Sequence, residues 1–63
     1  MCEFTVYLED NGNRDKITKN VIKAKLKDSV VTLLDSAGKV TKVEHARILT
    51  VDTLMQELIL QKS

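Results

Sequence analysis

The sequence predicts a single all-β domain over residues 1–63, and three observations lead to this prediction. Apolar and polar residues alternate in several segments, turn-forming residues separate these segments at short intervals, and the chain has only 63 residues. Alternation with a period of two is typical of a strand with one buried face. Short strands at regular spacing favour a sandwich or barrel.

The first half of the chain has the clearest alternation. Residues 2–8 form the first predicted strand, and Asn11-Gly12 follows it as a hairpin signal, because both residues tolerate a positive φ. The return strand is expected over 16–19, and a further strand over 21–27. The side chains expected on one face of the first strand are Cys2, Phe4, Val6 and Leu8, and those expected to face inward from 21–27 are Ile22, Ala24 and Leu26.

The second half predicts a central strand and two weaker ones. Residues 30–34 are β-branched and apolar, as a central strand would be. The turn that follows ends at Gly38, which can adopt a left-handed conformation. A weak strand is expected over 39–44 and another over 48–51, with a short turn near Asp52.

The last segment, 53–61, is compatible with either a strand or a helix. Thr53 could cap a helix, with Gln56 three residues later as in a capping box. Periodicity alone does not decide between the two for a short apolar run. We favour a strand, because the rest of the chain reads as short strands.

Five or six short antiparallel strands in so short a chain predict a curved sheet that closes on itself, as an Sm-like or SH3-like barrel. A domain of this size is only marginally stable. Small domains commonly gain stability from disulfides, a structural metal or oligomerisation. Cys2 is the only cysteine, so no internal disulfide can form, and we expect a homodimer.

Composition argues against several classes of protein. The net charge is +1, so no global attraction to nucleic acid or membranes is expected, and no apolar run approaches the roughly 20 residues of a membrane span. Glu3 and Glu9 interrupt the N-terminal stretch, which predicts no signal peptide, and a single thiol suits the reducing cytoplasm. One histidine and one cysteine mark no catalytic constellation, so we do not expect an enzyme.

The pair Met1-Cys2 has a distinctive metal-binding chemistry. The Met1 amine, the Cys2 amide nitrogen and the Cys2 thiolate can close two fused five-membered rings around a metal, nearly in one plane because the peptide is planar. Planar nitrogen and sulfur donors suit Ni(II) or Cu(II) rather than Zn(II). The alternative is that Cys2 is a small apolar residue at the start of a strand.

Other candidate residues have simpler interpretations. His45 is the only histidine and is more often a surface group than a ligand in such a position, and Met55 is expected to pack in the core or a loop. Five lysines within 12 residues could contact RNA phosphates, but with only two aromatic residues in the chain a solvated strand face is favoured. These lysines are Lys16, Lys19, Lys23, Lys25 and Lys27.

Several segments resemble the CooT-type family of small nickel-binding proteins. They are Met1-Cys2-Glu3, the strand through Tyr7, Asp10-Asn11-Gly12, Asn20-Val21-Ile22-Lys23, Val31–Asp35 with Gly38, and the closing stretch from Ile48 to Leu60. The resemblance implies a dimeric Sm-like barrel that binds Ni(II) through the N-terminal cysteine. It implies a metallochaperone or storage role in maturation of a nickel enzyme such as carbon monoxide dehydrogenase. Relatives have also been labelled predicted RNA-binding proteins, which is the alternative function. Residues 39–45 depart from many relatives.

Overall fold

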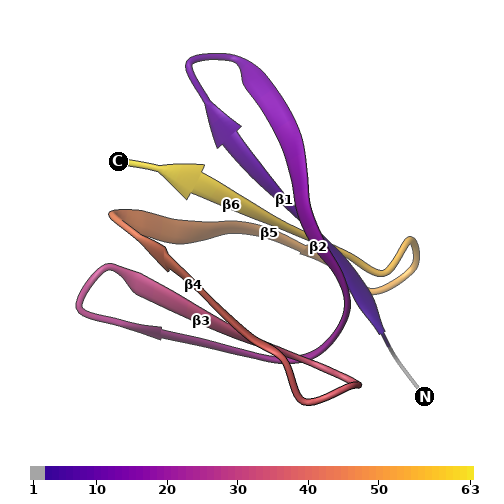
Figure 1. The fold of residues 1–63 in the computed structure, drawn as a ribbon. Coiled ribbons are helices and arrows are strands. Elements are labelled where there is room, and N and C mark those ends of the chain that lie inside the picture. The colour runs from indigo at the N-terminus through magenta and orange to yellow at the C-terminus, as the bar shows by residue number, and fades with distance from the viewer. Residues whose placement is uncertain (1–2) are drawn as a thin grey trace.

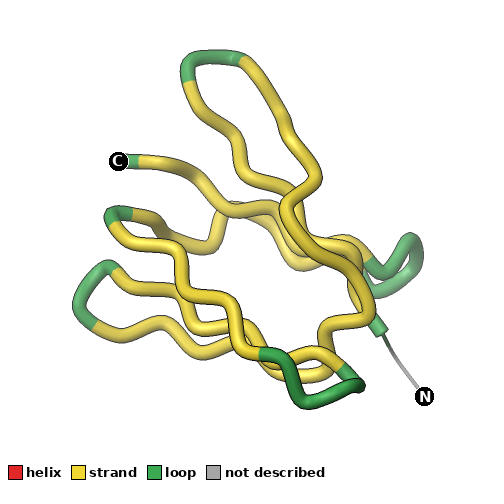
Figure 2. Tube along the Cα trace, viewed as in Figure 1, coloured by secondary structure: helices red, strands yellow, loops and turns green. Residues whose placement is uncertain are grey.

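The computed structural model describes residues 3–63, which form one strongly curled sheet of six strands and contain no helix (Figures 1 and 2). The strands are β1 (Phe4–Asp10), β2 (Asn13–Lys27), β3 (Val30–Asp35), β4 (Val40–Glu44), β5 (Ala46–Asp52) and β6 (Glu57–Lys62). The predicted all-β class is confirmed. The strand favoured for the C-terminal segment is also confirmed, after a turn over residues 53–56.

The strand order is β4-β3-β2-β1-β6-β5, so that β4 and β5 are the two ends of the sheet. The sheet curls as half a barrel (Figure 1), and the Ala46 N–H at the start of β5 donates to the carbonyl of Ser29, in the turn between β2 and β3, at 3.0 Å. Four of the five strand pairs are antiparallel, as expected. The β1–β6 pair is parallel, so the prediction of antiparallel strands is wrong for this pair: the β5–β6 hairpin brings β6 back beside β1, running in the same direction.

β2 is one strand of 15 residues, where the sequence predicted two separate strands. Its first half pairs with β1 and its second half pairs with β3, so it joins the two parts of the sheet (Figure 1). The predicted break falls at Asn20, which has a φ of 58° and whose carbonyl accepts a hydrogen bond from the Ser36 N–H at 2.9 Å. The chain therefore bends at this point without leaving the sheet.

The core lies inside the curl of the sheet and is built from aliphatic side chains. Phe4, Leu8, Ile17 and Ile48 pack around it as partly buried residues. The buried residues are Val6, Val21, Val31, Leu33, Val43, Ala46, Leu58, Ile59 and Leu60. Among residues 3–63, no buried polar side-chain atom is left without a hydrogen-bond partner.

The prediction that Ile22 faces inward is wrong. Val21 pairs with Asp35 and Lys23 pairs with Leu34, so Ile22 is an extra residue in a β-bulge. The bulge breaks the alternation, and as a result Val21 is buried while Ile22 is 47% exposed. Leu26 lies opposite the buried Val31, on the predicted side of the sheet, but it remains 45% exposed near the strand end.

No helix in residues 3–63 is long and apolar enough to cross a membrane.

Candidate metal site and the surfaces near it

The predicted nickel ligands, Met1 and Cys2, lie outside the described residues. The first described strand, β1, begins at Phe4, two residues after Cys2 in the chain. Over residues 3–63 there is no group of three or more histidine, cysteine, aspartate or glutamate side chains that could hold a metal ion. The N-terminal chelate therefore stays a prediction from the sequence.

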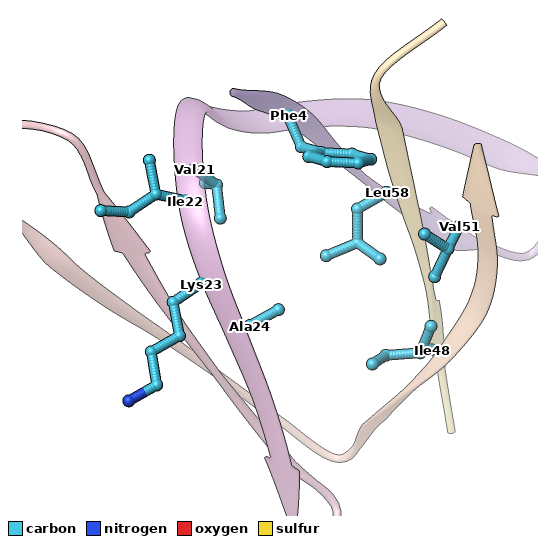
Figure 3. A pocket seen from close by; sticks show the side chains of 8 residues that line it. All are labelled: Phe4, Val21, Ile22, Lys23, Ala24, Ile48, Val51 and Leu58. Atoms are coloured by element: carbon cyan, nitrogen blue, oxygen red, sulfur yellow. The ribbon is translucent and has the colours of Figure 1, made fainter. Parts of the chain in front are cut away.

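The Phe4 side chain lines an apolar groove between β2 and β5 (Figure 3). Figure 3 shows Phe4, Leu58 and Ile48 around the hollow, whereas Ile22 and Lys23 point away from it. The groove is lined by Phe4, Val21, Ile22, Lys23, Ala24, Ile48, Val51 and Leu58. Its volume is about 230 Å³, which is below the roughly 300–1,000 Å³ of small-molecule pockets. The groove is therefore smaller than a usual small-molecule pocket.

Large apolar side chains are exposed beside the groove and beyond it. Ile22 and Val51, at its two sides, are 47% and 58% exposed. Leu54 and Met55 lie in the β5–β6 turn and are 88% and 63% exposed. This turn is held by the Asp52 carboxylate, which accepts hydrogen bonds from the Leu54 and Met55 N–H groups at 3.0 and 2.9 Å. Met55 thus lies in a loop, but its side chain is largely exposed, so the prediction that it packs is wrong.

His45 lies at the exposed corner between β4 and β5. Its φ of 54° places the backbone in the left-handed region, and its carbonyl accepts a hydrogen bond from the Ser63 N–H at 2.7 Å. The Lys62 ammonium donates to the carbonyl of the neighbouring Glu44 at 3.2 Å. Within the described part of the chain, the backbone of His45 thus helps to join the C-terminus to the β4–β5 corner.

The predicted lysine run does not share one surface. Lys16 and Lys19 lie on the half of β2 that pairs with β1, whereas Lys23, Lys25 and Lys27 lie on the half that pairs with β3. The second group is joined by Lys42 from β4, which sequence reasoning missed. The pairing of the strands would have revealed it, because Lys25 pairs with Thr32, and Thr32 pairs with Lys42.

The curled sheet, the small apolar groove and the exposed lysines define a small all-β protein. The chain matches the model of the family described as "CO dehydrogenase accessory protein CooT" over residues 1–61, and it belongs to this family. The CooT prediction is thereby confirmed, and membership implies a role accessory to CO dehydrogenase rather than that of the enzyme itself. No curated protein matches the chain.

Proposed function

We propose that this protein is a cytoplasmic nickel-binding accessory protein that supplies or stores Ni(II) for the maturation of CO dehydrogenase or a similar nickel enzyme. The observation that carries the proposal is the family match, which begins at residue 1 and so includes Met1-Cys2. This pair presents an amine, an amide nitrogen and a thiolate in a sequence that suits planar coordination of Ni(II). Nickel is then the cargo of the protein.

Three donors leave one position of a square plane open, and this has a functional advantage. A delivered metal must be exchanged, so a ligand of the client enzyme can enter at the fourth position before the three protein donors leave. A second copy of the chain could also supply the fourth donor. The amide and the thiol must each lose a proton when the metal binds, so the affinity for Ni(II) should rise with pH.

The homodimer is part of the proposal, and the exposed apolar surface around the groove supports it. Ile22 and Val51 flank a groove of side-chain dimensions, and the domain has too few residues to be more than marginally stable by itself. Exposed apolar patches mark interaction sites in small proteins, and Val51 is the most exposed of the large apolar side chains that line the groove. A second copy of this chain would bury it by a self-complementary contact.

An optical titration of the untagged protein with Ni(II) tests the metal site. A thiolate-to-nickel charge-transfer band should appear, and it should be absent in Cys2→Ser and in a variant extended at its N-terminus, which moves the free amine away from Cys2. His45→Ala is the matched control and should bind as the parent protein does. Nickel binding that survives Cys2→Ser would contradict the proposal.

Mass spectrometry under non-denaturing conditions tests the assembly. It reports retention of Met1, the number of chains and the number of metal ions together. We expect two chains in the parent protein and one chain in Val51→Asp, because a buried unpaired charge disfavours association. Lys16→Asp is the control and should remain dimeric, because Lys16 lies in the half of β2 that pairs with β1 and does not line the groove. A parent protein that is monomeric at every concentration would remove the homodimer from the proposal.

A further inference from the structure

The outer face of β2, β3 and β4 carries a regular array of nine side chains. The inner face of these strands holds the buried Val31, Leu33 and Val43, so alternate residues must point outward. Cross-strand partners place the outward residues in three rows: Lys23, Leu34 and Val40; Lys25, Thr32 and Lys42; Lys27, Val30 and Glu44. We call this array the lysine face.

The lysine face concentrates positive charge on a nearly neutral protein. Its four lysines and one glutamate give a formal charge of +3, and because the whole chain carries +1, the other 54 residues carry −2. The only ion pair within residues 3–63 joins Arg14 to Glu9, in the β1–β2 hairpin. The four ammonium groups therefore have no carboxylate partner within the described chain.

The middle row is the most specific part of this surface. Lys25 and Lys42 lie on either side of Thr32, and with strands about 4.8 Å apart their backbones are separated by about 10 Å, roughly the Debye length at 0.1 M salt. Two like charges at this distance repel each other in the free protein. A carboxylate placed over Thr32 would remove that repulsion. A shallow hollow lies at this place, lined by Lys25, Lys27, Asp28, Val30, Thr32 and Lys42. Its three lysines and one aspartate give the lining a formal charge of +2.

The remaining side chains of the face favour a protein over a nucleic acid as the ligand. Val30 and Leu34 are half-buried, and Val40 is 54% exposed, so apolar surface is interleaved with the lysines. No aromatic residue belongs to the three rows, and bound single-stranded RNA usually stacks its bases on aromatic side chains. Charged groups around apolar contacts are typical of protein interfaces with complementary potentials.

We propose that the lysine face docks an acidic patch on a partner protein, with carboxylates set against Lys25 and Lys42 and aliphatic side chains set against Val30 and Val40. The contact involves neither Met1 nor Cys2, so it stands or falls separately from nickel binding. It would hold an accessory protein on its partner through residues of β2, β3 and β4 alone. Charge attraction would also raise the rate of encounter at low salt.

The test uses a synthetic peptide of alternating glutamate and valine as the probe and follows the backbone amides of the full chain by NMR. We expect the peptide to shift the amides of β2, β3 and β4, and to bind less well as salt is raised. The double variant Lys25→Glu/Lys42→Glu should lose affinity by about tenfold or more, because like charges then face each other. The control Lys16→Glu/Lys19→Glu makes the same change in net charge on the other half of β2 and should lose less than about twofold.

A peptide of alternating lysine and valine provides the reverse test. It should bind Lys25→Glu/Lys42→Glu and not the parent protein, which also shows that the variant is folded and presents the same surface. Equal loss in the two glutamate variants would mean attraction by net charge alone and would overturn the proposal. Tighter binding of an oligouridine of equal charge than of the acidic peptide would overturn it in favour of an RNA surface.

Discussion

The inner and outer faces of β2, β3 and β4 are built from alternate residues of the same three strands, and they differ in almost every property. The inner face places Val31 and Leu33 at 0% and 1% exposure, packed in a continuous aliphatic core. The outer face, one residue away at each step, presents lysines and half-buried aliphatic side chains. Because successive side chains of a strand point to opposite faces, the same short segment places apolar residues in the core and charged residues in water.

Stability is therefore expected to depend on the inner face, and recognition of a partner on the outer face. Substitutions on the inner face remove apolar area from a packed core, whereas those on the lysine face change charges that water already solvates. If this division is correct, neighbouring residues of β3 should differ by several kcal/mol in their effect on the free energy of unfolding.

The largest effect is expected for Leu33→Ala. Leu33 is among the largest fully buried side chains, and its truncation should lower the free energy of unfolding by about 2–5 kcal/mol. Thr32→Ala, the adjacent residue on the outer face, should change it by less than about 0.5 kcal/mol. Urea unfolding followed by circular dichroism measures both. Similar losses in the two variants would contradict the division between the faces.

A smaller loss in the free energy of unfolding is expected at Asp35, the last residue of β3 before the β3–β4 turn. The Asp35 carboxylate accepts hydrogen bonds from the Ala37 and Lys39 N–H groups at 2.9 and 2.8 Å. Asp35→Ala should therefore cost about 1–2 kcal/mol, as the loss of two exposed charge-assisted hydrogen bonds implies. Asp10→Ala is the control, because no hydrogen bond to the Asp10 side chain is found in residues 3–63. Thermal melts of both variants would show whether the turn contributes as stated.

A gain in stability is expected at Ser29, in the turn that joins Lys27 to Val30 of the lysine face. Asp28 and Ser29 have φ values of 52° and 63°, the left-handed region that the β1–β2 turn fills with Asn11 and Gly12. Ser29→Gly should raise the free energy of unfolding by about 0.5–1 kcal/mol, because glycine adopts this conformation without a steric penalty. Ser36→Gly, in a turn residue without a positive φ, should not stabilise the protein. Loss of stability in Ser29→Gly would show that the side chain, not the backbone, determines this turn.

The smallest effect is expected for Lys42→Glu on the lysine face. The charge is exposed and has no ion pair in the described chain, so the free energy of unfolding should change by less than about 0.5 kcal/mol. The same variant should nevertheless weaken binding of the acidic peptide. A change in stability as large as that of Asp35→Ala would mean that Lys42 holds the sheet together, and the division between the faces would fail.

Most of the strands could be predicted from the sequence because their signals are local. The alternation around Val6, the apolar run from Val30 and the Asn11-Gly12 turn each act through neighbouring residues. The errors came where distant parts of the chain meet. Ile22 was placed inside because nothing local marks the β-bulge, which the register of β2 against Asp35 and Leu34 produces.

The candidate site residues likewise fall into those that the sequence alone indicated and those that only strand pairing brought together. Met1 and Cys2 were chosen on their donor chemistry and on the resemblance to the CooT-type family. They lie outside the described residues, and the family match over 1–61 supports the prediction without testing the ligands. Lys25 and Lys42 were not grouped, because 16 residues separate them in the chain and only pairing through Thr32 brings them to one row.

Local chemistry was thus enough to predict an all-β chain and the position of most turns, since side-chain alternation and tolerance of a positive φ are properties of a few adjacent residues. The family was predicted from a resemblance along most of the chain, and the match over residues 1–61 shows it. The tertiary structure alone decided the parallel β1–β6 pair, the bulge that exposes Ile22 and the arrival of Lys42 beside Thr32. Each of these depends on which strand lies next to which, and at what register, and that choice is made by burying one shared core between segments far apart in the chain.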